Sequence, residues 1–308
     1  MPSSISTRYP LLWLGLAIIL ATTTGITGRS IIRKKTLNTP IAAYLIPTDN
    51  TARIKFPWWP STQLALPRAL RSGERLTITA GTSLKLIHAD TGVTELVTGP
   101  IQLFLQQKQP SETNALVSPL PEILSSINTK PGTGNAIIIT SPVGVTRYLN
   151  PLITWVARDD TTYDVAVTDP ADAFVPPRVA RGVRPPIALA DLETPQRRQL
   201  GVDRNYILVI REANSSTIGG ASRLLTTTNA QLKNQLPSSP ADLIAEAATA
   251  MAKLPARTGD AWLALSRLPS DWIRSELGIR LRLRVSAELN YTEELNCALI
   301  DARALKTP

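Results

Sequence analysis

The sequence predicts a mainly β protein with an α-helical C-terminal part, preceded by an N-terminal transmembrane helix. Three observations predict this fold class: an uncharged stretch near the N-terminus, glycine-punctuated segments of alternating polarity in the middle, and apolar residues at four-residue spacing towards the C-terminus. We expect five consecutive parts: a membrane anchor with a basic flank (1–35), a proline-rich linker (36–69), a β-meander domain (70–135), a β sandwich (136–236) and helical hairpins (237–308).

The anchor is a stretch of 20 uncharged residues, 9–28, with one basic residue before it and four in the next seven positions. A helix needs about 20 mostly apolar residues to cross the hydrocarbon core, so we predict that 9–28 spans a membrane. A cleaved signal peptide and a buried soluble helix are the alternatives. The flanking basic residues favour a cytoplasmic C-terminal part. We nevertheless expect that part outside the cytoplasm, because large domains translocate largely regardless of flanking charge.

Composition argues against several kinds of function. The net charge is +9, but residues 1–35 carry five basic and no acidic residues, which leaves 28 basic and 24 acidic residues in the remainder. That balance argues against nucleic-acid binding. The single histidine, His88, and the single cysteine, Cys297, cannot form a histidine- or cysteine-based metal site or an internal disulfide. We expect no metal, no cofactor and no catalytic residues.

The linker region 36–69 contains five prolines and an adjacent pair of tryptophans, Trp58 and Trp59. In an extended chain, neighbouring side chains face opposite sides, so we expect one tryptophan to be buried and the other to cover an edge. An alternative interpretation is an aromatic pair that contacts a ligand, such as cell-wall polysaccharide, or another component of the envelope.

The β-meander region alternates apolar and polar residues, and its glycines recur every seven to eleven residues, as in short antiparallel strands joined by tight turns. The segment LRSGERLTITAGTSLKLIHADTGVTELVTGPIQLFL, residues 70–105, resembles the β domain of FecR-type membrane proteins. The resemblance rests on Gly73-Glu74, Gly81, Asp90-Thr-Gly92 and Gly99-Pro100. It implies a transmembrane regulator, although the cytoplasmic segment that holds the sigma factor in that family has no counterpart in the eight residues before the span.

The second β region contains one cleanly alternating strand, with apolar residues at positions 163, 165 and 167. The order Pro-x-x-x-Trp, Tyr-x-Val-x-Val and then a late tyrosine resembles a fibronectin type III domain. The resemblance implies a sandwich in which alternating apolar residues pack between two sheets. We predict that its core includes Trp155, Tyr163, Val165, Val167 and Tyr206.

Helical signals dominate from residue 237. Ser239-Pro240 is a helix start, and a first apolar stripe follows it. A second stripe at Ile273, Leu277, Leu281 and Val285 is expected to pack against a last helix over 293–305. The segment AELNYTEELNCALIDARAL resembles a tetratricopeptide-like hairpin. We expect the face around Leu243, Ala247 and Trp262 to remain open for another protein, because two hairpins bury little apolar surface.

Other chemistry-bearing residues support only weak hypotheses. His88 is expected in a surface turn, and the acidic residues between Asp159 and Asp172 follow no known calcium-loop spacing. Cys297 is expected to be buried. The sequence therefore favours a non-enzymatic, single-pass inner-membrane protein of the bacterial envelope, with its C-terminal part periplasmic, that binds other envelope proteins. A carbohydrate- or peptidoglycan-binding module and a FecR-like signalling regulator are the alternatives.

Overall fold

The computed structural model describes residues 39–49, 51–57, 60–105, 137–158, 160–171, 177–193, 200–213, 215, 219–226, 235–252 and 255–305. The expected membrane span at 9–28 lies outside these residues. Within the described part of the chain, no helix is both long and apolar enough to cross a membrane. The described part is mainly β, with helices confined to the C-terminal region, as predicted.

The N-terminal β domain consists of two four-stranded antiparallel sheets, with strand orders β4-β1-β6-β7 and β3-β2-β5-β8. Apolar residues from both sheets meet between them and form one core. The alternation predicted around residues 76–78 and 84–86 places every second side chain in this core. The strands are β1 (Ile41–Pro47), β2 (Arg53–Lys55), β3 (Thr62–Gln63), β4 (Arg68–Arg71), β5 (Arg75–Ile78), β6 (Ser83–His88), β7 (Thr94–Thr98) and β8 (Ile101–Phe104).

Strand β1 corrects the expectation of a linker over 36–69. β1 lies between β4 and β6, and all seven of its residues are buried. Ala43 and Leu45 face the core between the sheets, whereas Tyr44 and Ile46 face the C-terminal helices. A strand buried on both faces is a continuous apolar run without polar alternation, so the period-two signal that identifies an exposed strand is missing here.

The second β unit is a two-layered sandwich of a five-stranded sheet, β10-β16-β15-β12-β13, and a three-stranded sheet, β14-β11-β9. All neighbouring strands are antiparallel except β10 and β16, which run parallel. The elements are β9 (Ile139–Ser141), β10 (Gly144–Thr146), β11 (Leu152–Trp155), β12 (Tyr163–Thr168), β13 (Arg178–Val183), β14 (Ile187–Ala188), the 3-10 turn η1 (Leu189–Asp191), β15 (Asn205–Glu212) and β16 (Gly220–Thr226).

The predicted core of this sandwich is confirmed. Trp155, Tyr163, Val165, Val167 and Tyr206 are each at most 4% exposed and belong to one cluster. The rings of Trp155 and Tyr163, from different sheets, pack edge to face with centroids 5.4 Å apart. The Tyr206 hydroxyl accepts a hydrogen bond of 2.6 Å from the backbone N–H of Gly201, which closes the turn before β15.

The C-terminal region forms α3 (Pro240–Ala252), α4 (Thr258–Leu265), the single turn α5 (Ser270–Ile273), α6 (Glu276–Glu288) and α7 (Thr292–Ala304). Ser239 begins α3 as predicted, since its hydroxyl accepts a hydrogen bond from the N–H of Asp242. Ser275 caps α6 in the same way through Gly278. The predicted four-residue stripe of α6 is present, but its helix begins at Glu276.

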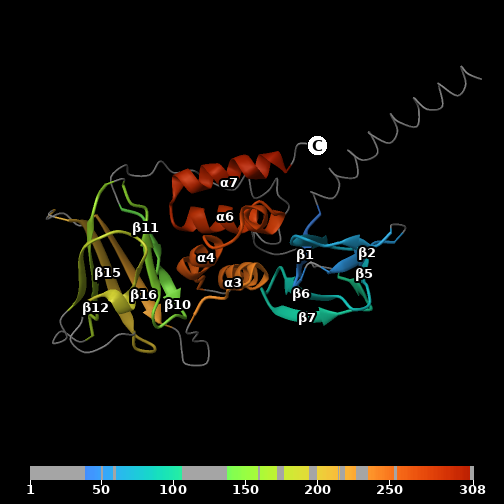
Figure 1. The fold of residues 1–308 in the computed structure, drawn as a ribbon, viewed down its shortest axis with the longest axis horizontal. Helices are drawn as coiled ribbons and strands as arrows, with labels where there is room; N and C mark the ends of the chain where they lie inside the picture. Colours follow the sequence, from blue (N-terminus) through green and yellow to red (C-terminus); the bar gives the residue numbers. More distant parts are fainter. Residues whose placement is uncertain are drawn as a thin grey trace, which may run out of the picture.

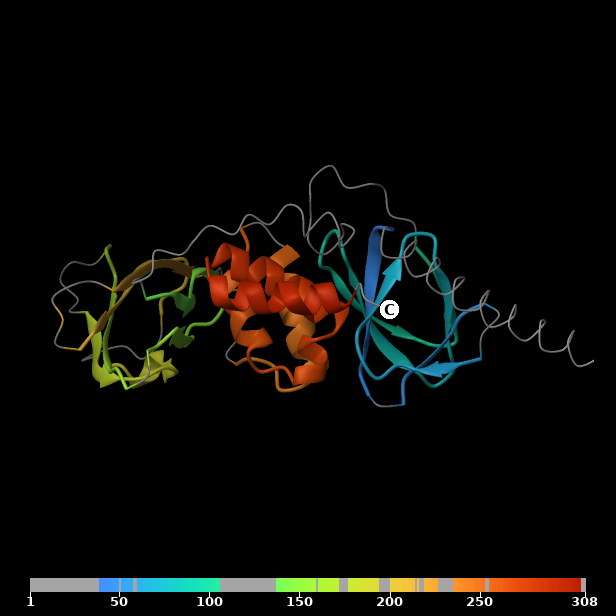
Figure 2. The same cartoon turned by 90° about the horizontal axis from the view of Figure 1, so that it is seen from above.

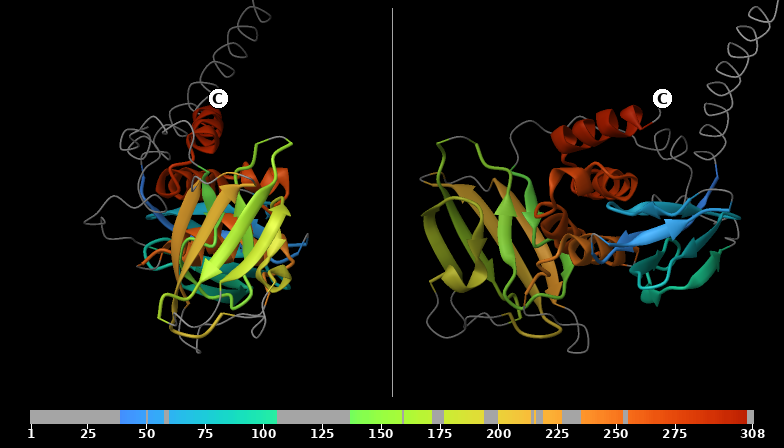
Figure 3. Two further views of the ribbon diagram at one scale, coloured as in Figure 1. Left: turned by 90° about the vertical axis from the view of Figure 1, so that its left-hand side faces the viewer. Right: turned by 45° about the vertical axis from the view of Figure 1, so that its right-hand side comes forward.

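The order of the three units in space differs from their order in the chain. The helices lie between the two β units, with the sandwich on one side and the N-terminal β domain on the other (Figures 1 and 2). Helix α7 packs on α6 at the edge of the helical layer (Figure 3). The largest core cluster consists of residues from α3, α4 and α6 together with the outer face of β1 and β6.

Candidate functional site

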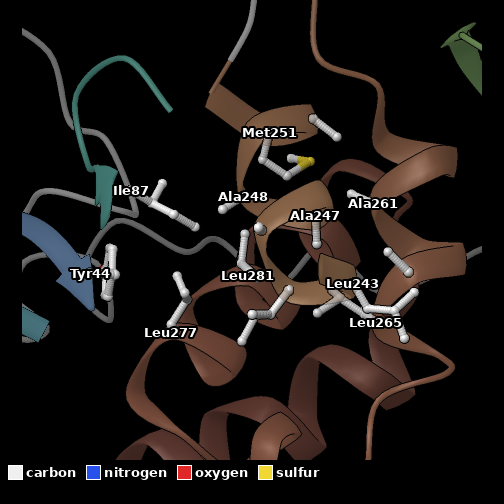
Figure 4. Close-up of a cluster of buried hydrophobic side chains, with 14 of the residues drawn as sticks. Tyr44, Ile87, Leu243, Ala247, Ala248, Met251, Ala261, Leu265, Leu277 and Leu281 are labelled. Carbon is white, nitrogen blue, oxygen red and sulfur yellow. The ribbon is translucent and has the colours of Figure 1, made fainter. Parts of the chain in front are cut away.

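The residues expected to bind a partner do not form one exposed surface. Leu243 is 3% exposed and Ala247 is fully buried in the cluster that joins the helices to the N-terminal β domain (Figure 4). Trp262 is half-buried and packs against Tyr291. Trp58 and Trp59 lie outside the described residues. The expectation of an open face around Leu243 and Ala247 is therefore wrong, because the chain covers this stripe itself.

The reason is a different pairing of helix α6. The sequence predicted that Leu277, Leu281 and Val285 would pack against the last helix. Instead they face α3 and the β1–β6 surface. Helix α7 packs on another side of α6, through Ile279 and Leu283. Helix α6 thus has two apolar faces, and the sequence pattern gave no indication of which one takes which neighbour.

The weaker candidate residues serve local contacts. His88 ends β6, and its Nε2 lies 3.2 Å from a Glu95 carboxylate oxygen. Asp164 and Asp169 each pair with an arginine on the sandwich surface, and Asp159 and Asp172 lie outside the described residues. Across the described ranges, no group of three histidine, cysteine or acidic side chains could hold a metal ion. Cys297 is exposed, so the expectation that it is buried is wrong.

A first cluster of buried charged side chains lies at the junction between the N-terminal β domain and α6. Glu276, in the first turn of α6, accepts hydrogen bonds from Arg71 of β4 at 2.9 and 3.0 Å. It also accepts one at 2.8 Å from Arg280, whose side chain is fully buried. Arg71 reaches back to the carbonyl of Thr39 through its other terminal nitrogen. One carboxylate therefore ties two arginines from different units.

This junction closes one side of a pocket with a volume of about 540 Å³. The chain from Gln63 to Ala69 forms one wall, and Leu305, just after α7, lies on another. Arg68 and Glu74 line the pocket as a 3.3 Å ion pair. The described lining contains no histidine, cysteine or serine. The volume suits a small ligand or a short peptide, but each acidic group in the lining already has an arginine partner.

The second concentration of charge joins the helices to the sandwich. Arg257, before α4, bonds Glu246 of α3 at 3.2 Å and Asp260 of α4 at 3.1 Å. From the sandwich, Arg147 forms an ion pair with Glu246, and Thr146 donates a hydrogen bond of 2.7 Å to Asp260. Glu246, Arg257 and Asp260 are each at most 5% exposed. Two cations and two anions balance at this buried contact.

The electrostatics of the two junctions differ. Burial alone would raise the pKa of Glu276, but Arg280 and Arg71 outweigh it, and the pKa of this carboxyl is lowered. At the other junction, burial raises the pKa of Asp260 despite the opposing effect of Arg257 and Thr146. Burial also lowers the pKa of Arg147. These groups hold the units together by paired charge at both junctions.

Sequence reasoning missed both junctions, although a partial signal was present. Arg280, Arg282 and Arg284 interrupt a helix whose apolar stripe is otherwise complete. Such arginines inside an apolar pattern indicate buried ion pairs. Arg282 indeed bonds Glu294 and Asp301 of α7, at 2.6 Å each. The junction with the N-terminal β domain could not be predicted, because Arg71 lies 205 residues from Glu276.

No protein-family model and no curated protein matched the chain.

Proposed function

We propose that this chain is a non-enzymatic, single-pass membrane protein of the bacterial envelope that acts as a scaffold for other envelope proteins. One observation carries the proposal: the helices are wedged between the two β units and joined to each by buried paired charge. Such contacts hold two surface-bearing modules at a fixed separation. A scaffold needs that property, whereas a loosely tethered pair of binding modules does not.

The composition of the chain supports the proposed location. The uncharged span at 9–28 is long enough to anchor the chain, and the described units begin soon after it, at residue 39. We propose that the C-terminal part lies on the periplasmic side of the inner membrane. The N-terminal β domain would then stand next to the membrane, with the helices and the sandwich beyond it.

We further propose that the two β modules are of the FecR-like and fibronectin type III-like kinds. The Tyr206 hydroxyl bonded to the backbone a few residues upstream resembles the tyrosine corner of immunoglobulin-like sandwiches, whose architecture fibronectin type III domains share. In the FecR-like segment, Gly73, Gly81 and Gly92 all have positive φ, as tight turns between short strands require. A chain that combines a FecR-like and a fibronectin type III-like module is consistent with a protein that binds other proteins.

The test has two parts, applied to the full chain. A periplasm-active phosphatase fused after the last residue should be active, and a reporter active only in the cytoplasm should be silent at the same position. Affinity purification from crosslinked membranes should then enrich specific envelope proteins over a control that carries residues 1–38 alone. The reverse reporter pattern would overturn the location. Enrichment of cell-wall polysaccharide without any protein would overturn the scaffold role.

A further inference from the structure

The outer face of α7 is the most exposed helical surface in the described chain. Its inner residues Leu295, Ala298 and Ala302 pack on α6. Three- and four-residue steps place the exposed residues on one opposite face. They are Glu293, Asn296, Cys297, Ile300, Arg303 and Ala304. Ile300 at the middle of this face is 64% exposed, although helices normally turn such residues inwards.

The charges of this face are arranged by sign along the helix. Glu293 lies in the first turn and Arg303 in the last, ten residues or about 15 Å apart. In the described part of the chain neither forms an ion pair. The other acidic side chains of the helix, Glu294 and Asp301, are taken by Arg282. This outer face of α7 therefore has an acidic end, a weakly polar to apolar centre and a basic end.

We propose that this face binds a second copy of the same chain, with the two α7 helices antiparallel across a twofold axis at the level of Ala298. Position 298 is midway between Glu293 and Arg303, so antiparallel pairing sets each carboxylate opposite the guanidinium of the other copy. Asn296 and Ile300 are also symmetric about this position and face each other. A parallel pairing would set Glu293 against Glu293.

In a twofold dimer the same surface of both copies meets, so that surface must be complementary to itself. The order of charges along this face meets that requirement. One helix face covers less than the roughly 800 Å² per partner that stable complexes bury, so we expect a weak, reversible dimer. Dimerisation through α7 requires neither the membrane anchor nor the capture of another envelope protein. It can therefore be tested independently of the proposed scaffold function.

Cys297 makes the test direct, because it is the only cysteine of the chain and lies on this face. It lies one residue from the proposed axis, so the two thiols are offset by only about 3 Å along paired helices. The full-length chain in detergent is treated with a short bis-maleimide linker, and covalent dimer is measured on denaturing gels. Efficient, concentration-dependent dimer formation is expected from the wild type and none from C297S.

Charge reversal then identifies the geometry. We expect E293R and R303E each to lower the crosslinked yield at a fixed concentration by about tenfold, because each sets like charges together twice in the dimer. The double variant E293R/R303E restores the pairing with reversed signs and should recover most of the yield. Reversal of the exposed Arg267, R267E, serves as the control away from α7 with the same change of charge as R303E, and should leave the yield unchanged.

Four results would overturn the proposal. A monomeric wild type would mean that this face is free or takes a different protein. Equal yields in the wild type and the single reversals would mean that the crosslink arises from random collision. A crosslinked yield that stays low in the double variant E293R/R303E would exclude the antiparallel pairing. Sedimentation of C297S should show the same concentration-dependent association without a linker, and a purely monomeric C297S would likewise count against the dimer.

Discussion

At the scale of single residues, Gly92 shows how one position can meet two demands. It ends the turn between β6 and β7 with a φ of +65°, a conformation that side chains rarely adopt. It also touches α3, because a Cβ built there would come within 2.3 Å of the Ala252 Cβ. The predicted hairpin turn is thus also a contact between the N-terminal β domain and the helices.

We expect Gly92→Ala to destabilise the chain more than Gly73→Ala. Gly73 also has positive φ, +82°, but its Cβ would meet nothing within 4 Å. Gly73→Ala should therefore lower the free energy of unfolding by only about 1–2 kcal/mol, because alanine is strained in the left-handed conformation. Gly92→Ala should lower it by about 1–3 kcal/mol more, because the added methyl group overpacks the contact with α3. Urea unfolding of both variants measures the difference. Equal losses would show that α3 moves away at no cost.

Glu276 is the residue that joins the N-terminal β domain to α6. Glu276→Gln leaves the buried Arg280 without its carboxylate, and such broken buried pairs cost about 3–5 kcal/mol. The matched control is Glu288→Gln on the same helix, because its pair with Arg284 is more exposed and glutamine keeps a carbonyl acceptor for the Thr258 hydroxyl. We expect this control to lose about 1 kcal/mol of stability or less. Chemical denaturation compares the two variants. A similar small loss in both would mean that water already reaches Arg280.

The same carboxyl predicts a pH dependence. The pKa of Glu276 is lowered by Arg280 and Arg71, so its contribution to stability is complete above its ordinary value of 4.5. The contribution is lost as pH falls below that value towards the pKa in the folded chain. Thermal unfolding between pH 7 and pH 3 should therefore show a steeper decline for wild type than for Glu276→Gln. Parallel curves would contradict this assignment.

At the scale of elements, the sandwich is held by its two inner faces. Trp155 is 4% exposed, and its ring meets Tyr163 of the opposite sheet, whereas Leu152 on the same strand points to the other side. Trp155→Ala should cost about 3–5 kcal/mol, and the control Leu152→Ala about 1 kcal/mol or less. Hydrogen exchange in β12 and β15 should rise only in the first variant. Unchanged protection there would contradict the proposed core.

Elements that alternate in polarity could be predicted from sequence, and elements buried on two sides could not. The strand around Tyr163, Val165 and Val167 has one buried and one wetter face, so its period was visible. β1 and α6 each contact two different partners, and their patterns do not say which residue faces which partner. The partners come from distant parts of the chain. The candidate surface around Leu243 failed for this reason.

At the scale of the whole molecule, the C-terminal helices complete the N-terminal β domain. Ile41, Tyr44, Ile46 and Ile87 present an apolar surface that only these helices cover within the described structure. Figure 4 shows Tyr44 and Ile87 facing the helices. This alters the meaning of a truncation experiment. Removing residues 237–308 does not subtract an independent tail, because it uncovers one face of a sheet that lies elsewhere in the sequence.

A chain ending at residue 236 should therefore bind a hydrophobic dye strongly and lose exchange protection in β1 and β6. The central strands β12 and β15 should keep theirs, because their core lies within the sandwich. A single change in the full chain, Leu281→Ala, should weaken the same contact by about 2–5 kcal/mol without truncation. A truncated chain with protected β1 and β6 and no dye binding would refute this dependence.

The separation of Arg71 from Glu276 by 205 residues has a consequence for synthesis. A ribosome adds about 5–20 residues per second, so roughly 10–40 s pass between the two ends of this ion pair. Throughout that interval the newly made N-terminal sheet has a bare apolar side. The cell must shield that apolar face, delay its formation or tolerate its tendency to aggregate. Translation products that stop before the last helices keep the face exposed permanently.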